Sequence, residues 1–467
     1  MKRTLLIVGA VIGWLVGLSL ATQYYLQVEW WYWAVIVIAG AALWRVRSRL
    51  GYLVILALAL MAGLWRGELY FRSQQALSTR DFHGAKVVAV GRVAAEPVWN
   101  SDRLYEFYLD DVELDGRPVD GMLKIKSMVG SPREGQLVQA EGKVGRALGR
   151  AQSQIWYASV KVVDPVQPYP IRVKQLMQQG LDVALTPETA AFASGVLFGG
   201  RSQLPSDIQT ATQVAGLTHI LAVSGYNLTV VVALCAVFWR RRSRLATMVA
   251  LSAIGLFVLM TGATASVVRA AVMSGLILLV ARTRRELDVR VALGATVVIM
   301  TAWNPRYLYG DLGWQLSVLA LVGVLFVAPA LIPRRVLRGS WLIELFMISL
   351  AAHLMTAPLI AHVFGSFSLI APLANLIVLP LIPLVMLGAF MAAGLGIFLP
   401  TQAPMYALPI GQAIDAVLSL IQILAKIPTA AVVTHVDTAV MLVFYAALFA
   451  LAAVGLRRHS ILQVKKV

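Results

Sequence analysis

Polar side chains interrupt one otherwise apolar stretch of the chain, residues 213–232. They are His219, Ser224, Asn227 and Thr229. In lipid, each of these groups costs free energy unless protein or water supplies a hydrogen-bond partner. Gly216 and Gly225 weaken a helix here and remove side-chain bulk. The pattern predicts a broken or closely packed segment that faces protein or water on one side, as in segments that line membrane pathways.

More polar residues follow at membrane depth. Arg269 lies near the start of one apolar run, and Asp311 and Gln315 stand four apart on one face of another. The rest of this group are Glu344, His353, His362, Asn375 and Asp415. A buried charge needs a partner or water, so we expect Arg269 to pair with Asp311, or else with Glu344 or Asp415. Any one of these residues can instead be a packing hydrogen bond or an interfacial side chain, but together they favour a hydrophilic passage.

These residues do not form a catalytic or metal-binding pattern. His353 and His362 are nine apart, and no zinc-hydrolase spacing occurs. No serine nucleophile elbow, phosphate-cradling glycine loop or paired-carboxylate motif is present. Cys235 is the single cysteine, which excludes an intrachain disulfide framework and a cysteine-rich metal site. We therefore expect no catalytic residue, metal or cofactor, no ATPase activity, and no enzyme.

The composition requires a membrane. Of 467 residues 59% are hydrophobic and 13% charged, and the mean hydropathy is +0.76, which excludes an ordinary soluble domain. Apolar runs of helix-spanning length recur along the chain, with one long interruption from about residue 71 to 170. The fold class expected is a polytopic α-helical membrane protein with one inserted domain outside the membrane.

The net charge of +17 is a signal of topology. Residues 72–172 hold 14 Lys/Arg and 12 Asp/Glu, so only +2 belongs to the inserted domain. The excess lies in short loops: Lys2/Arg3, Arg45/Arg47/Arg49, Arg240/Arg241/Arg242/Arg244, Arg282/Arg284/Arg285/Arg290, Arg334/Arg335/Arg338 and Arg457/Arg458/Lys465/Lys466. Positive loops mark the cytoplasmic side, so the charge is only weak support for nucleic-acid binding.

About twelve spans fit this charge pattern, some broken or re-entrant. They lie near residues 4–21, 31–44, 51–65, 214–238, 245–262, 265–281, 291–303, 312–332, 341–364, 370–398, 405–425 and 438–456. Both termini then lie in the cytoplasm and the inserted domain lies outside. The first run is expected to be a retained span, and Trp30–Trp33 an interfacial belt. Residues 370–398 carry Pro372, Pro380 and Pro383, which predict a broken or re-entrant helix.

The insert has the periodicity of β-strands. Five short runs, separated by turn signals, cover residues 86–95, 104–113, 122–128, 136–146 and 157–163. Five such strands predict a small extracytoplasmic β-barrel, with the OB-fold as the leading candidate. The domains expected are residues 1–70 with about three transmembrane helices, 71–170 with the OB-like barrel, 171–212 with an amphipathic interfacial segment, and 213–467 with the remaining membrane spans.

Aromatic and basic residues of the insert suggest a groove that stacks bases and contacts phosphates of single-stranded nucleic acid. They are Arg92, Trp99, Tyr105, Phe107, Lys124, Lys126, Lys143 and Trp156. The alternative, given equal weight, is that the aromatic rings fill the barrel and the lysines form a solvated face.

At four places the sequence resembles the ComEC-type competence proteins, the inner-membrane channels for DNA uptake in natural transformation. The resemblance rests on residues 216–225 (GLTHILAVSG), 266–273 (SVVRAAVM), 311–317 (DLGWQLS) and the region 357–383 with Asn375. It spans nearly the whole chain and implies passage of one DNA strand into the cytoplasm. The intramembrane residues it implies are His219, Ser224, Arg269, Asp311 and Gln315.

The resemblance also implies partners: single-stranded DNA, a periplasmic or surface DNA receptor, a cytoplasmic helicase and a separate nuclease. There are two departures from the family pattern. Gly225-Tyr226-Asn227 stands where a Gly-Leu-His run is usual. No metallo-β-lactamase-like metal motif occurs before Val467, so we expect a short form, a split partner or a truncated chain without nuclease activity.

The hypothesis at this point is a DNA channel with a polar path formed by His219, Asn227, Arg269 and Gln315. The sequence leaves two rivals open. One is a transporter of a small solute or another polymer, in which the barrel is a scaffold. The other is a non-conducting membrane scaffold that recruits a nuclease.

Overall fold

The computed structural model describes residues 2–24, 49–73, 82–94, 97–99, 104–119, 122–128, 132–146, 153–164, 168–200, 204–221, 225–237, 244–281, 287–331, 341–427, 430–434 and 436–464. The chain divides into two units, Met1–Gln175 and Leu176–Val467. Several predictions fall outside the described residues: the span near 31–44, the aromatic cluster Trp30–Trp33, most of the basic loops, and Ser224.

The first unit opens with two helices, α1 (Lys2–Tyr24) and α3 (Arg49–Ser73), at the positions of the first and third predicted spans. Glycines bring their backbones together. A Cβ on Gly17 would overlap the carbonyl group of Leu60, and one on Gly63 would overlap that of Trp14. Small residues at a helix contact permit this approach in membrane proteins.

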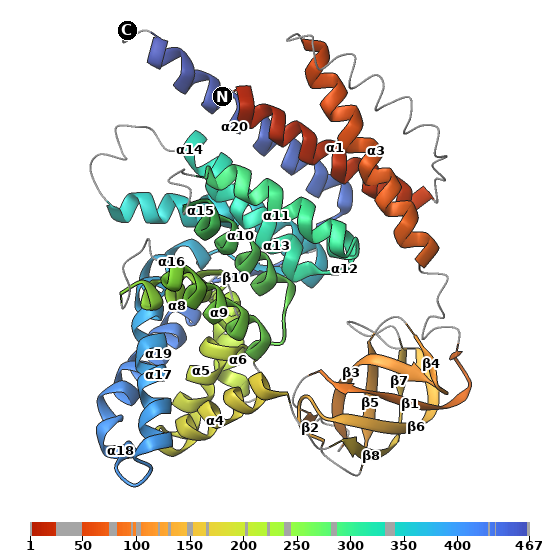
Figure 1. Cartoon of the computed structure of the whole chain (residues 1–467). Coiled ribbons are helices and arrows are strands. Elements are labelled where there is room, and N and C mark those ends of the chain that lie inside the picture. Colours follow the sequence, from red (N-terminus) through yellow and green to blue (C-terminus); the bar gives the residue numbers. More distant parts are fainter. Residues whose placement is uncertain are drawn as a thin grey trace. The chain divides into compact units, whose positions relative to one another are not determined.

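The inserted domain is a closed five-stranded β-barrel, which confirms the predicted barrel (Figure 1). Its strands are β1 (Lys86–Val93), β3 (Tyr105–Leu114), β5 (Leu123–Ser127), β6 (Leu137–Arg146) and β7 (Ser153–Ile155). They neighbour one another in the order β1-β3-β5-β7-β6, and β6 pairs again with β1. The β5–β7 pair is parallel, whereas the other pairs are antiparallel. Three outer strands join them: β2 (Val98–Trp99) and β4 (Arg117–Pro118) on β3, and β8 (Ser159–Asp164) on β6.

Alternation along the strands builds the barrel core. In β1, every second side chain is buried, and in β3 and β5 the inward positions include Phe107, Leu109, Leu123 and Ile125. Four of the five predicted strands lie where the alternating pattern places them. The fifth differs, because the barrel is closed by β7, and the predicted run from residue 157 begins only at Ser159.

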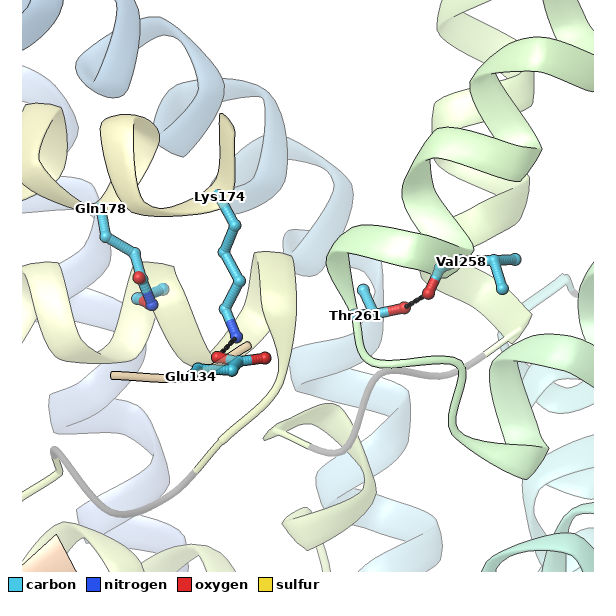
Figure 2. Close-up of polar contacts among 6 residues, drawn as sticks. Glu134, Lys174, Gln178, Val258 and Thr261 are labelled. Atoms are coloured by element: carbon cyan, nitrogen blue, oxygen red, sulfur yellow. Dashed lines mark hydrogen bonds and ion pairs between the residues drawn. The ribbon is translucent and has the colours of Figure 1, made fainter. Parts of the chain in front are cut away.

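The helix that follows the barrel, α4 (Tyr169–Ala184), is anchored in the first unit by a buried ion pair. The Lys174 ammonium lies 2.6 Å from a carboxylate oxygen of Glu134, and both side chains are buried (Figure 2). Gly135 has a φ of +84°, and a side chain there would collide with Ile171. The glycine therefore permits both the turn before β6 and its contact with the start of α4.

The second unit begins with helices that differ in part from the predicted interfacial segment. These are α5 (Pro187–Phe198), α6 (Ser206–Val214), α7 (Thr218–Leu221) and α8 (Gly225–Val237). A surface helix was expected, yet residues 189–198 of α5 are all buried. The reason is their composition: small and apolar side chains surround this helix, so it has no polar face for solvent.

The predicted break within residues 213–232 is confirmed. Helix α6 ends at Val214, Gly216 adopts a φ of +73°, and α8 begins at Gly225. A side chain at position 216 would meet Ala371 and Ser368, so glycine serves both the backbone conformation and the close contact.

The remaining helices follow the predicted spans. They are α9 (Arg244–Met260), α10 (Ala265–Ala281), α11 (Val289–Trp303), α12 (Tyr307–Gly310), α13 (Leu312–Val322) with the π-helical turn η2 (Gly323–Val327), α14 (Ala328–Leu331), α15 (Trp341–Phe364), α16 (Ala371–Val378), the 3-10 turn η3 (Leu379–Leu381), α17 (Ile382–Phe398), α18 (Ala403–Tyr406), α19 (Leu408–Ala425) and α20 (Thr438–Val464).

Within the described residues, four helical stretches are long and apolar enough to cross a membrane: Leu312–Leu331, Trp341–Phe364, Ala371–Phe398 and Leu408–Ala425. Shorter apolar helices cover Ile7–Thr22, Leu245–Met260, Ala265–Val280, Val289–Trp303 and Thr438–Leu451. The chain is therefore a helical membrane protein with a β-barrel domain, while twelve spans remain a prediction.

Proline shapes the longest stretch, as predicted. Helix α16 gives way to the turn η3 at Pro380, and α17 starts with Pro383 near its beginning. Two short strands, β9 (Ser366–Ser368) and β10 (Ala431–Val433), pair antiparallel and bring the segment after α15 against the segment before α20.

Candidate nucleic-acid interface and buried polar cluster

Four of the predicted DNA-binding residues of the barrel occupy neighbouring positions on adjacent strands, but on two faces: Trp99 and Tyr105 share the face of Ser127, whereas Lys126 points to the opposite face with Trp156. Trp99 of β2 is paired with Tyr105 of β3, and Tyr105 is paired with Ser127 of β5, next to Lys126. Ser127 donates a hydrogen bond of 2.8 Å to the carbonyl oxygen of Ala158, just beyond Trp156. We call Trp99, Tyr105, Lys126, Trp156 and Tyr157 the barrel row.

The segment between β7 and β8 displays two aromatic rings of this row. Trp156 is 42% exposed and Tyr157 is 66% exposed. Tyr157 has a φ of +54°, a left-handed conformation that is unfavourable for a residue with a bulky side chain. The chain then rejoins the sheet, because the amide of Ala158 donates a hydrogen bond to the carbonyl oxygen of Lys126. Such local strain is found where a structure holds residues for a function.

The other end of the row is also aromatic. Trp99 is 54% exposed, and its ring meets that of Tyr105 edge to face, with 4.6 Å between centroids. Trp99 and Tyr105 therefore form one aromatic pair, while Trp156 lies with Lys126 on the other face of the strands. Each exposed ring can stack an unpaired base, since every base has a π-face.

The charges beside the row are largely compensated within it. The Lys126 ammonium lies 4.0 Å from the centroid of the Trp156 ring, a cation–π contact. The carboxylate of Glu106 lies 2.5 Å from Lys124 and 3.8 Å from Lys126. Two lysines and one glutamate leave a local charge of about +1. Stacking is therefore the stronger recognition element, and phosphate attraction the weaker one.

The remaining predicted residues of the barrel lie elsewhere. Phe107 is 1% exposed in the barrel core, so it takes the alternative role left open by the sequence and is no surface residue. Arg92 donates a hydrogen bond of 2.9 Å to the carbonyl oxygen of Gly135. Lys143 is exposed on β6, directly opposite Lys86 of β1.

In the second unit, several predicted path residues bond to nearby backbone groups. Asn227 is buried and its amide donates to the carbonyl oxygen of Val196 at 2.8 Å. Gln315 donates to the carbonyl oxygen of Leu308 at 2.9 Å. His219 is exposed, with Nδ1 3.2 Å from the carbonyl oxygen of Gly216.

Asp311 is the N-cap of α13, since its carboxylate accepts a hydrogen bond of 2.8 Å from the amide of Trp314. The expected ion pair between Arg269 and Asp311 is wrong: among the described residues Arg269 forms no ion pair, either with Asp311 or with the proposed substitutes Glu344 and Asp415. An aspartate immediately before a helix is a strong capping signal, and it outweighs a partnership across helices.

Arg269 is a buried cation that has no ion-pair partner among the described residues. It is 5% exposed, and Nη1 donates a long hydrogen bond of 3.5 Å to the carbonyl oxygen of Ser317. Its Nε has no hydrogen-bond partner among the residues that the structure describes. The hydroxyl groups of Ser266 and Ser317 lie 3.3 Å apart, and a Cβ built on Gly225 would lie 3.3 Å from Nη2 of Arg269.

In the described part of the second unit, two further buried polar atoms lack a hydrogen-bond partner: Nε1 of Trp314 and Oδ1 of Asn375. The amide nitrogen of Asn375 donates to Ser349 at 3.1 Å. Buried polar atoms without a hydrogen-bond partner are rare, and each one indicates local strain, an ordered water molecule or a bound ligand. The sequence reasoning missed Trp314, because tryptophan in an apolar helix reads as packing.

The two membrane histidines are tied to their surroundings. His362 Nδ1 lies 2.7 Å from the carbonyl oxygen of Val436, and the ring of His353 packs against Phe367. Within the described part of the chain, no group of three or more His, Cys, Asp or Glu side chains is placed to hold a metal ion.

Comparison with known proteins gives one family. The family profile described as "Competence protein" matches residues 196–458, more than half of the chain. The chain is also similar to ComE operon protein 3 of Bacillus subtilis (strain 168), with 26% identity over 199 residues. That match covers 42% of this chain and 25% of the relative, so the chain matches about a quarter of the relative's length. No solved structure matches the chain.

Proposed function

The chain belongs to the competence protein family, and we propose that it moves single-stranded DNA across the cytoplasmic membrane during natural transformation. In this proposal the barrel receives the strand outside the membrane, and the helices of the second unit provide the route inward. A cytoplasmic helicase or binding protein supplies the pull. The chain itself carries out no catalytic step, and a separate nuclease acts on the other strand.

The barrel row is the observation that carries this proposal. It combines three exposed aromatic rings, Trp99, Trp156 and Tyr157, with a lysine held against one of them. A closed five-stranded barrel with a binding face is the architecture of OB-folds, which commonly bind oligonucleotides, and we propose that this barrel is of that type. Duplex DNA keeps its bases stacked on one another, so exposed rings favour an unpaired strand.

The membrane topology proposed from the positive loops agrees with one contact in the second unit. Strands β9 and β10 pair, so the segments that contain them lie on the same side of the membrane. An even number of crossings must therefore separate them. The stretches Ala371–Phe398 and Leu408–Ala425 supply two. This parity agrees with the proposed topology, in which the positive loops place both segments outside and both termini in the cytoplasm.

Orphaned polar atoms support a route through the second unit. Arg269, Trp314 and Asn375 each keep a buried nitrogen or oxygen that no described residue contacts by a hydrogen bond. Apolar packing alone would not place such groups in a membrane protein, because each costs free energy when dry. Water or a translocating strand would satisfy them.

The test measures binding of a fluorescent oligothymidylate to the full chain in phosphatidylcholine nanodiscs, by anisotropy. Replacing Trp156 by alanine should weaken binding by about fivefold to 150-fold, since stacking of one base contributes about 1–3 kcal/mol. Tyr169→Ala is the matched control, because Tyr169 is an exposed aromatic residue of the same unit outside the row.

Equal binding by Trp156→Ala, Tyr169→Ala and the wild type would reject the barrel row as the interface. Absence of any oligonucleotide binding by the wild type would favour the alternative of a solute transporter with a scaffolding barrel.

A further inference from the structure

We infer that the second unit contains a buried phosphate-binding subsite, formed by the guanidinium of Arg269 and the N-terminus of helix α8. The inference rests on the proposed function and deepens it, because it names the chemical group of the DNA that the route recognises. Phosphate on a lipid headgroup has the same chemistry, so the experiment must separate the two sources.

The first observation is an uncompensated cation. Arg269 presents five N–H donors, is 5% exposed, and forms no ion pair with any described carboxylate. Among the described residues, its polar contact is one long hydrogen bond to the carbonyl oxygen of Ser317, and its Nε has no partner. A buried charge in this condition is costly unless an anion or water accompanies it. The planar guanidinium fits a phosphate by two parallel hydrogen bonds.

The second observation is the helix end beside it. Helix α8 spans 13 residues and begins at Gly225. The first amides of a helix have no acceptor within the helix, and the helix dipole adds partial positive charge there. Nη2 of Arg269 lies 3.3 Å from the point where a Cβ of Gly225 would stand. Two sources of positive potential therefore converge on one place, which is how proteins bind phosphate at helix ends.

The glycine has a specific role in this arrangement. A Cβ at position 225 would also lie 3.1 Å from the Cβ of Ala270, tighter than ordinary contact. Alanine at 225 would thus press on α10 and on the guanidinium together. The absence of a side chain keeps the approach to the amides open, as in other sites where backbone meets phosphate.

A subsite of this kind suits a moving polyanion. A single fixed arginine gives a strand one favourable position for a phosphodiester, whereas a row of several would hold it in place. Ser317, whose carbonyl oxygen accepts the long hydrogen bond from Nη1, also carries a hydroxyl group that lies 3.3 Å from that of Ser266.

The experiment follows the thermal unfolding of the full chain in phosphatidylcholine nanodiscs by intrinsic tryptophan fluorescence. The probes are inorganic phosphate, an oligothymidylate, and its uncharged methylphosphonate analogue. Inorganic phosphate and oligothymidylate should raise the midpoint of the wild type saturably, and the uncharged analogue should not raise it through this site. Arg269→Met should weaken the response to inorganic phosphate by about tenfold or more, since charge-assisted hydrogen bonds are lost.

Arg290→Gln is the control, because it removes an exposed arginine of the same unit. Without phosphate, Arg269→Met should unfold no earlier than the wild type, since it removes an uncompensated buried charge. If that variant fails to insert, Arg269→Lys is used, and it should bind phosphate several-fold more weakly because it lacks the guanidinium fork. An equal phosphate response in wild type and the inserted variant would overturn the subsite, as would no response by the wild type.

Two further arms identify the source of the phosphate. If DNA is the ligand, the oligothymidylate response should persist in nanodiscs that contain phosphatidylglycerol. If phosphatidylglycerol abolishes that response completely, the site binds lipid, and a role of the subsite in the DNA route is overturned. DNA uptake by cells that carry Arg269→Met separates phosphate binding by the subsite from a role of the subsite in DNA transport. Normal uptake with a lost phosphate response would reject a role of the subsite in transport. Lost barrel binding with an intact phosphate response would reject the proposed DNA interface instead.

Discussion

We predict that Glu106 limits the affinity of the barrel row for nucleic acid, and that its replacement by glutamine raises this affinity. The carboxylate lies 2.5 Å from the Lys124 ammonium and 3.8 Å from that of Lys126. All three side chains are largely buried against the sheet, so their mutual attraction is less screened than that of a fully exposed pair. Glutamine keeps the shape of the side chain and removes its charge.

The expected magnitude follows from counterion release. Each phosphate neutralised by a protein cation on a single strand contributes about −0.7 to the slope of log affinity against log salt concentration. Freeing one or two lysines should therefore steepen the slope by about 0.7–1.4. A fourfold dilution of salt should then raise the ratio of variant to wild-type affinity by about threefold to sevenfold. Lys126 keeps its contact with Trp156, so base stacking stays intact.

The assay is anisotropy of a labelled oligothymidylate with the full chain in phosphatidylcholine nanodiscs at four salt concentrations. Glu141→Gln is the matched control: it makes the same change in net charge, but its carboxylate pairs with Lys86, an exposed residue outside the row, at 2.7 Å. The control should leave the slope close to that of the wild type. Equal slopes for Glu106→Gln and Glu141→Gln would refute a specific electrostatic role for this cluster.

Three other predictions concern stability. Glu134→Gln leaves the buried ammonium of Lys174 without its anion and should destabilise the first unit by about 3–5 kcal/mol, while replacing both residues by apolar ones should recover most of the loss in thermal unfolding. Gly396→Ala drives a Cβ into the backbone of α4 and should cost about 1–3 kcal/mol, whereas Gly394→Ala, with open space around its Cβ, should be nearly neutral. The hydrogen bond to the carboxylate of Glu141 and its negative charge raise the pKa of Lys86 in the folded protein. The contribution of this pair to stability is therefore present below the ordinary lysine pKa of 10.5, and it is lost as the pH rises through the higher pKa of the folded state. Melting curves of Lys86→Ala and wild type should therefore converge at strongly alkaline pH.

The periodicity of apolar residues and the positions of glycine and proline predicted most of the architecture. Alternation identified four barrel strands, and positive loops together with apolar runs located the helices. Glycine at 216 and proline at 380 predicted interruptions that the structure contains. These features are local, because each depends on the conformation that one residue allows or on a repeat of two or 3.6 residues.

Features that depend on long-range contacts were not predictable in this way. Strand β7 has three residues, too few for a periodic signal, and it exists because β5 and β6 supply partners on both sides. The burial of helix α5 depends on the helices that pack around it in the second unit. Arg269 was correctly identified as unusual, but its supposed partner Asp311 is a helix cap. Charges pair across helices only where the fold leaves both of them available.

The barrel row also shows what the sequence could not specify. Trp99, Tyr105, Lys126 and Trp156 were candidates on residue type alone; register places Trp99 beside Tyr105 on one face, and Lys126 meets Trp156 on the other. The left-handed backbone at Tyr157 has no signature in the sequence, and it lies between two points held to the barrel, the paired residue Ile155 and the hydrogen-bonded amide of Ala158.

The most direct test of DNA passage along this chain is site-specific photocrosslinking in cells that are taking up labelled DNA. A photoreactive amino acid is placed at position 156 of the full chain, and at position 169 as the control. We expect position 156 to crosslink to one strand of the incoming DNA in single-stranded form, well above the yield at position 169. Equal yields at the two positions, or crosslinks to duplex DNA, would contradict the account.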